Sequence, residues 1–215
     1  MSDYWIKQLE DDIEWREKEL SLLKFQVLQA STKKDPRQYK ILLRAISVML
    51  YAHYEGFCKF AWDIYLEALA RKGIKRKECK DNIVKLSLKS EFGQLRKDLS
   101  SDKIWDFAQT FHSTLLEKKL VFTQKLGTQS NLRPTLFISN INEVELNCTL
   151  ANFYKNELDA LVDNRNSIAH GENFKISNIA EYQKYEQIAI EVMYELAISI
   201  IDALEKKLYL KTPTP

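Results

Sequence analysis

The chain has 215 residues, which predicts one sizeable domain, and its 45% of hydrophobic residues, with ten Tyr, ten Phe and four Trp, exclude a wholly disordered protein. Five Gly and four Pro are too few for the many tight turns of a β-sandwich or β-barrel, so the composition favours long helices. The 32 Lys and Arg nearly balance the 30 Asp and Glu, so a role in nucleic-acid binding would require a local cluster of cations.

The cysteines and the apolar stretches indicate a soluble protein of the cytoplasm. Cys58, Cys79 and Cys148 are far apart and show no CxxC or Cys/His ligand spacing, so we expect reduced thiols and no metal site. The first residues are polar and charged, unlike a signal peptide. The richest apolar stretch, residues 41–52, contains Arg44 and is too short to span a bilayer. We therefore expect a cytoplasmic protein with no membrane partner and no cofactor.

Two long helices are predicted for the first third of the chain. Residues 4–30 carry apolar side chains at three- and four-residue spacings, which indicates an amphipathic helix. Asp35 followed by Pro36 is a typical N-cap and first-turn pair, so a second helix should begin there and run to about Lys72, just before a glycine. Its middle, residues 41–69, is apolar on nearly every side and should form the buried central helix.

The remaining two thirds of the chain contain one segment that the sequence does not resolve and several predicted helices. Residues 74–129 leave a choice between a short strand and a helix near 83–88, although 102–116 has helical spacing. Four elements follow: a loop at 126–131, a short helix at 134–141, a helix at 150–169 closed by Gly171, and a last long helix at 177–208. We expect a single all-α domain over residues 1–210 and a disordered tail at 211–215.

One predicted helix carries a charged residue on its apolar side. The buried line of the penultimate long helix includes Leu161 and Ile168, and the position between them on this line is Arg165. A buried guanidinium is costly unless it is paired or faces an interface. Asn166 and His170 are four residues apart on one face, so the amide can orient the imidazole. Such a set can bind a phosphate and transfer protons, although the same spacing would also be seen if the Arg formed a salt bridge and the His capped the helix.

Two stretches of the sequence resemble motifs of a known superfamily and favour the functional interpretation of these residues. The stretch RNSIAHG, residues 165–171, resembles the R-N-x-x-x-H signature of the HEPN superfamily (higher eukaryotes and prokaryotes nucleotide-binding domain). The stretch LYAHYEGFCK, residues 50–59, resembles the second-helix motif of a bacterial branch of stand-alone HEPN proteins linked to defence and toxin systems. The order of the helices is also similar to that of the superfamily. The resemblance therefore covers most of the chain, although residues 74–145 contribute little to it. The resemblance implies a HEPN-type bundle of long antiparallel helices that forms a homodimer.

The resemblance also implies a chemistry. In this superfamily, two R-x4-6-H motifs face each other across the dimer axis and form one metal-independent ribonuclease site. Arg165 would then hold the scissile phosphate, His170 would act as general base on the ribose 2′-OH or as acid at the leaving 5′ oxygen, and Asn166 would position the phosphate or the imidazole. The implied activity is that of an endoribonuclease of a toxin or anti-phage defence system, which leaves 2′,3′-cyclic phosphate and 5′-OH ends.

One position departs from part of the superfamily. Some family toxins carry a tyrosine two residues after the histidine, and a partner nucleotidyltransferase modifies it. This position is Glu172 here, so silencing by adenylylation at that tyrosine is not expected.

Two further sets of polar residues have both a functional and a structural interpretation. A run of cations just past the central helix can contact an RNA backbone or form a solvated connector: Arg71, Lys72, Lys75, Arg76, Lys77 and Lys80. His53 and Glu55 can support the Arg165/His170 site, or they can be hydrogen-bonded residues of the core, with Glu55 paired to Lys59. For His53 and Glu55 we favour the structural interpretation. Four aromatic residues are expected in the core and not in a base-stacking platform: Trp62, Tyr65, Trp105 and Phe107.

Another class of function remains open. The main alternative is a non-catalytic or latent HEPN module that binds a nucleotide or RNA, or that docks onto a partner defence protein. The partners expected from the resemblance are therefore RNA, a second copy of the chain, and an antitoxin or another defence protein.

Overall fold

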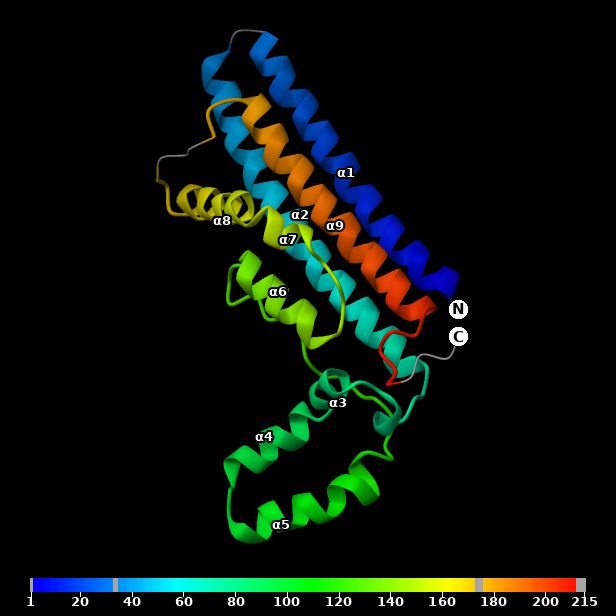
Figure 1. Cartoon of the computed structure of the whole chain (residues 1–215). Coiled ribbons are helices and arrows are strands. Elements are labelled where there is room, and N and C mark those ends of the chain that lie inside the picture. Colours follow the sequence, from blue (N-terminus) through cyan, green and yellow to red (C-terminus); the bar gives the residue numbers. More distant parts are fainter. Residues whose placement is uncertain (1, 33–34, 173–175, 212–215) are drawn as a thin grey trace.

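Three long helices form the main body of the protein. The computed structural model describes residues 2–32, 35–172 and 176–211, and in it α1 (Ser2–Thr32), α2 (Pro36–Arg71) and α9 (Ile179–Glu205) lie side by side (Figure 1). The shorter helices between them are α3 (Asp81–Ser87), α4 (Lys89–Lys97), α5 (Ser101–Thr110), α6 (Pro134–Glu143), α7 (Leu150–Phe153) and α8 (Lys155–Ala169). No strand occurs in these residues, which confirms the prediction of an all-α fold.

The central helix α2 begins and ends where the sequence predicts. The Asp35 carboxylate accepts hydrogen bonds from the backbone N–H groups of Arg37 and Gln38, at 3.1 and 2.9 Å, and Pro36 occupies the first turn. Gly73 follows the helix with a φ of 66°, a left-handed conformation that glycine adopts without steric cost. Because α2 contacts α1, α8 and α9, its side chains set the positions of all three.

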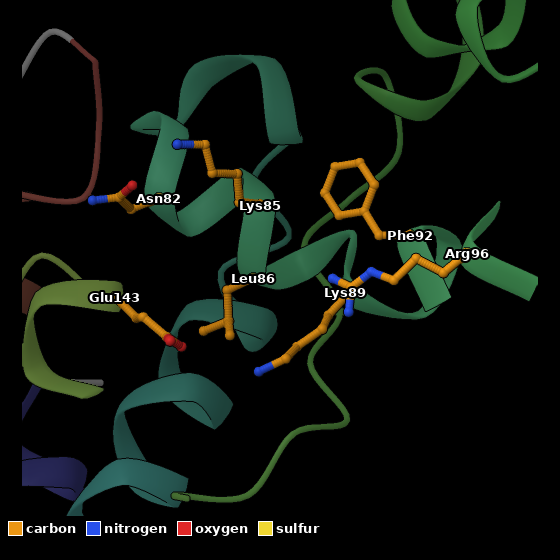
Figure 2. A pocket seen from close by; sticks show the side chains of 7 residues that line it. All are labelled: Asn82, Lys85, Leu86, Lys89, Phe92, Arg96 and Glu143. Atoms are coloured by element: carbon orange, nitrogen blue, oxygen red, sulfur yellow. The ribbon is translucent and has the colours of Figure 1, made fainter. Parts of the chain in front are cut away.

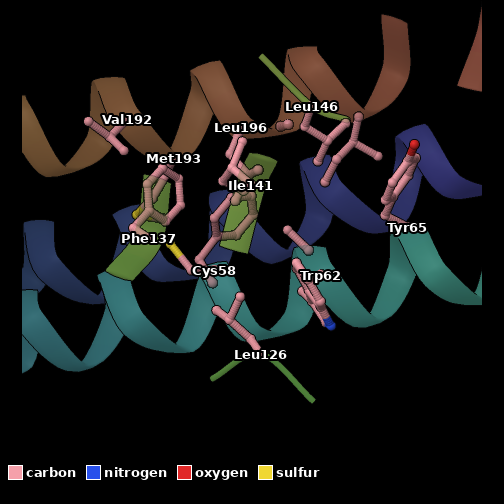
Figure 3. Packing of buried hydrophobic residues seen from close by; sticks show 14 of the residues in the cluster. Cys58, Trp62, Tyr65, Leu126, Phe137, Ile141, Leu146, Val192, Met193 and Leu196 are labelled. Atoms are coloured by element: carbon pink, nitrogen blue, oxygen red, sulfur yellow. The ribbon is translucent and has the colours of Figure 1, made fainter. Parts of the chain in front are cut away.

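One continuous apolar core surrounds α2. Figure 3 shows part of it, in which Cys58 of α2 lies near Phe137 of α6 and Met193 of α9, and Trp62 lies on the side of α2 near Leu126. Trp62 is buried, as is Tyr65 one turn further along, so the prediction that both belong to the core is confirmed. This packing fixes α2 as the platform against which α8 lies.

The helix predicted at 150–169 is divided in two. Tyr154 separates α7 from α8, with a backbone ψ of 27° that departs from helical geometry. The Glu195 carboxylate of α9 accepts hydrogen bonds from the backbone N–H groups of Thr149 and Leu150, at 2.8 and 3.0 Å, so the start of α7 is anchored to α9. The last helix begins two residues later than predicted, at Ile179, because the Asn178 side chain caps it.

Helices α3, α4 and α5 project from one end of the bundle as an arm (Figure 1). The guanidinium of Arg76, whose side chain is buried, fixes the base of this arm through hydrogen bonds of 2.9 and 2.7 Å to the hydroxyl and carbonyl oxygens of Ser87. No residue of α4 or α5 is buried. The prediction that Trp105 belongs to the core is therefore wrong, since this side chain is 64% exposed on α5, whereas Phe107 is half-buried against Phe92.

The described part of the C-terminus returns to the base of the arm. The backbone N–H of Lys211, predicted as the first residue of the tail, donates to the carbonyl oxygen of Glu78 at 2.9 Å. The remaining tail residues, 212–215, lie outside the described residues. Among the described helices, none combines the length and the apolar character that a membrane crossing requires.

Candidate functional site

The C-terminal half of α8 carries the Arg165 side chain into a half-buried position against α2. The central carbon of its guanidinium lies 5.0 Å from the centroid of the Tyr51 ring, a cation–π geometry. The Nη1 atom donates to the Oδ1 atoms of Asn166, at 2.8 Å, and of Asn131, at 3.3 Å. These three partners are neutral, so they orient the guanidinium without neutralising its charge. An anion can therefore bind to a cation that is already positioned.

Tyr51 connects this guanidinium to the loop before α6. Its hydroxyl oxygen accepts a hydrogen bond from the backbone N–H of Leu132 at 2.8 Å, next to Asn131. Burial, with a smaller contribution from the nearby Glu55 carboxylate, raises the pKa of Tyr51 to about 12, although the N–H of Leu132 and the Arg165 guanidinium oppose this, so the phenol stays neutral near pH 7. One tyrosine therefore supports the guanidinium with its ring and holds the loop that carries Asn131 with its hydroxyl.

His170 lies at the exposed end of α8, as its C-cap residue. Gly171 has a φ of 74°, and the helix closes through hydrogen bonds from the N–H of Gly171 to Ile168 O, at 3.1 Å, and from the N–H of Glu172 to Ser167 O, at 2.8 Å. This confirms the predicted C-terminus of the helix. The imidazole is therefore presented to solvent five residues beyond Arg165, where it can reach a substrate.

Two features of the site differ from the sequence-based expectation. The Asn166 amide oxygen accepts from Arg165, so the described contact of Asn166 orients the guanidinium and not the imidazole. In addition, Arg44 of α2 donates to the carbonyl oxygen of Glu172 at 3.3 Å, which brings a second cation next to the end of α8. A second guanidinium is therefore anchored beside the end of α8 that carries His170.

Three residues that line this site were not identified from the sequence: Arg44, Tyr51 and Asn131. They lie far from the motif along the chain, and a tyrosine in an apolar helix is ordinarily a core residue. The position of Arg165 in the sequence does predict that such residues exist, because a guanidinium on the buried line of a helix requires an aromatic or polar partner. The position of Arg165 does not predict which residue this partner is.

The two residues considered as support for the site point to different neighbours. Glu55 lies one turn from Tyr51, and its carboxylate is 2.9 Å from Lys59 Nζ, the pairing expected from the sequence. His53 is buried against α1, where its Nδ1 atom is 3.4 Å from Arg16 Nη1. Its Nε2 atom lies 2.8 Å from Glu19 Oε2, but without the alignment of a hydrogen bond. These contacts favour the structural interpretation of His53.

The predicted RNA-binding run is occupied by contacts within the chain. The six cations and their neighbours are Arg71 with Glu67, Lys72 over the ring of Tyr209, Lys75 and Lys77 with Glu117, Arg76 with Ser87 and Glu91, and Lys80 with Glu145. Arg71 ends α2 and Tyr51 lies near its middle, so at 1.5 Å per residue the run begins ~30 Å along the helix from the Arg165 site. Within one chain, these contacts favour the connector interpretation.

The described residues contain no group of three or more His, Cys, Asp or Glu side chains arranged to hold a metal ion. The side chains that gather around the end of α8 are instead two guanidiniums, an imidazole, two amides and a phenol. Such a set provides positive charge and hydrogen-bond donors for an oxyanion, together with one imidazole.

Comparison with families of known proteins identifies the family of this chain. The family model described as MAE_28990-like HEPN matches residues 5–209, which is almost the whole chain. No curated protein and no solved structure matches the chain.

Proposed function

The chain belongs to the MAE_28990-like HEPN family, and from that premise we propose that it is a metal-independent endoribonuclease of a toxin or anti-phage defence system. HEPN families include both ribonucleases and nucleotide-binding modules. The observation that favours the ribonuclease is that one helix end carries both Arg165, which is held by neutral partners, and the exposed His170 five residues further on. A module that only bound a phosphate would need the guanidinium but not the imidazole.

The proposed reaction is an attack of the ribose 2′-OH on the adjacent phosphorus. A general base removes the 2′ proton while the new P–O2′ bond forms, the P–O5′ bond breaks, and a general acid gives its proton to the leaving 5′ oxygen. The products are a 2′,3′-cyclic phosphate and a 5′-OH. Arg165 stabilises the negative charge that grows on the phosphate oxygens in the transition state, because its guanidinium is already oriented by Tyr51 and Asn166.

This reaction uses two proton-transfer groups, and the chain contains only three histidines. His53 is buried against α1, and His112 lies in the turn after α5, on the arm. A single chain therefore brings one imidazole, that of His170, to the end of α8. We propose that a second copy of the chain supplies the other imidazole, so that two Arg165/His170 pairs form one composite site in a homodimer.

The test is RNA cleavage by the purified wild type, Arg165→Ala and His170→Ala proteins in the presence of EDTA, with the product ends mapped. Removal of the imidazole should lower kcat by about 10²–10⁴, because it removes general acid–base catalysis. Removal of the guanidinium should cost about 10²–10³, the usual effect of losing one donor to an oxyanion. Cyclic phosphate ends are expected from the wild type.

A matched control is His112→Ala, which removes an exposed histidine on the arm and should cleave RNA like the wild type. Cleavage that EDTA abolishes, or that survives His170→Ala, would contradict the proposed mechanism. RNA or nucleotide binding that requires Arg165 but yields no cleavage would favour the alternative, a non-catalytic HEPN module that uses the same oriented guanidinium to hold a phosphate.

A further inference from the structure

A line of three cations and one aromatic ring runs along the arm. Lys85, Lys89, Phe92 and Arg96, named here the arm stripe, are spaced four, three and four residues apart across α3 and α4. The helical hydrogen bonds continue through the junction at Leu88, whose N–H donates to Val84 O at 3.0 Å and whose carbonyl accepts from the N–H of Phe92 at 2.9 Å. All four side chains line one hollow on the surface of the arm.

The cations of the arm stripe differ from Arg76 and Lys80 at the base of the arm. Near the base of the arm, Arg76 pairs with Glu91 at 2.9 Å, and Lys80 lies 3.6 Å from a carboxylate oxygen of Glu145. Among the described residues, no ion pair involves the cations of the arm stripe, which are all exposed. Their charge is therefore available to an anionic ligand.

The arm stripe lines a hollow of about 340 Å³. Figure 2 shows the four side chains together with Asn82 and Leu86 from α3 and with Glu143, which closes the opposite side from the end of α6. The Phe92 ring is half-buried, with its centroid 5.6 Å from that of Phe107, so it is held in place by the arm. Cations around a fixed ring are the combination with which proteins hold the phosphates and bases of a single strand.

The hollow lies on the same side of the long helices as the Arg165 site. Helix α6 contacts α8 at one end of this side and α3 at the other, and Figure 1 shows the three in succession. The loop before α6 carries Asn131, a partner of Arg165, and the end of α6 carries Glu143 of the hollow. A strand bound at the end of α8 can therefore continue over α6 to the arm.

We infer that the arm stripe binds the phosphate backbone of a single-stranded RNA whose cleaved bond lies at the Arg165/His170 site. The identity of the ligand rests on the proposed function, whereas the binding surface itself rests on the unpaired cations and the hollow. The arm stripe thus gives the protein contacts beyond the scissile phosphate and favours long strands over short ones.

The test measures the binding of a labelled oligouridylate to the full chain carrying His170→Ala, which prevents cleavage during the measurement. Adding Lys85→Gln, Lys89→Gln and Arg96→Gln should weaken binding at least ~10-fold at low salt and lower the slope of log K against log salt by about 2, since each phosphate contact in a single strand contributes about 0.7. Circular dichroism and thermal unfolding establish that the variant is folded.

The matched control removes the same charge from exposed lysines of α1 and the end of α9, with Lys7→Gln, Lys18→Gln and Lys206→Gln in the same background. The control should leave both the affinity and the slope near the starting values. Equal losses in the two triple variants would overturn the inference, because they would show an effect of net charge alone. Tighter binding of polyglutamate than of oligouridylate, lost in the arm-stripe variant, would also overturn it in favour of an acidic protein.

Cleavage assays separate this inference from the proposed function. With His170 intact, the arm-stripe variant should have a higher KM for a long RNA and an unchanged KM for a dinucleotide that cannot reach the arm. An active enzyme whose KM for long RNA is unchanged by the arm-stripe substitutions would refute the inference and leave the ribonuclease proposal standing. Stripe-dependent RNA binding by a protein that cleaves nothing would support the inference and refute the ribonuclease proposal.

Discussion

At the scale of single residues, the orientation of Arg165 depends on Tyr51. The ring lies under the guanidinium, and the hydroxyl accepts from the backbone N–H of Leu132 beside Asn131. Tyr51→Phe keeps the ring and leaves one buried N–H without its acceptor, which should cost about 1–3 kcal/mol of stability. Tyr51→Leu also removes the cation–π contact, worth about 0.5–2 kcal/mol, and should lower kcat for RNA cleavage by up to ~30-fold relative to Tyr51→Phe.

Steady-state kinetics on both variants, beside their unfolding curves, distinguish positioning from stability. A positioning role predicts that Tyr51→Leu lowers kcat more than it changes KM at a temperature where both variants are fully folded. Equal kcat values for the two variants would show that the ring does not orient Arg165 for the reaction.

Another residue-scale prediction concerns His53. Burial lowers the pKa of His53, and the neighbouring Arg16 guanidinium lowers it further, whereas the carboxylates of Glu19 and Asp12 oppose this shift. The unfolded chain therefore binds a proton below about pH 6.5 that the folded protein does not yet bind. The free energy of unfolding therefore keeps this contribution above about pH 6.5. It loses the contribution as the pH falls from there through the lower pKa of His53 in the folded protein.

Urea unfolding at about pH 7.5 and about pH 5.5 checks this sign. The wild type should lose more stability on acidification than His53→Gln, which has no titrating group at this position. A larger acid-induced loss in His53→Gln would show that burial is not the dominant influence on this imidazole, and that the Glu19 carboxylate stabilises its charged form.

At the scale of elements, the long helices could be predicted because their signals are local. The cap at Asp35, the glycine after α2 and the apolar spacing of α1 each lie within a few residues of the boundary that they specify. Helix α5 lies largely within the stretch 102–116 whose apolar spacing predicts a helix, whereas α4 buries no residue and its pattern does not decide between a helix and another structure. The start of α7 at Leu150 is held by Glu195, which lies 45 residues further along the chain, so no local pattern predicts the division of this segment into α7 and α8.

The candidate site shows the same division between local and distant signals. Arg165, Asn166 and His170 lie at one end of a single helix, so their spacing in the sequence is enough to predict that they belong to one site. Tyr51 and Asn131 come from other elements, so the fold had to be known before they could be assigned to the site. The basic run after α2 could be recognised from the sequence because its cations are close together along the chain. The cations of the arm stripe are separated by several residues and come together only in the folded arm, so the sequence alone did not predict this surface.

At the scale of the whole molecule, the proposed chemistry requires two chains. One chain brings a single exposed imidazole to the end of α8, and its other two histidines lie against α1 and on the arm. If the active site is shared, a subunit without this imidazole should inactivate the wild-type subunit with which it pairs. The composite site thus predicts a dominant effect that a site contained in one chain would not show.

This prediction is tested by adding increasing amounts of His170→Ala protein to a fixed amount of wild type, allowing the subunits to exchange, and measuring RNA cleavage. The rate should fall in step with the fraction of wild-type homodimer, because a mixed dimer lacks one proton-transfer group and should be slower by about 10²–10⁴. Sedimentation of the same mixtures gives the dimer fraction directly. A rate that stays constant as the variant is added, or a wild type that remains monomeric at concentrations where it is fully active, would show that one chain carries the whole site.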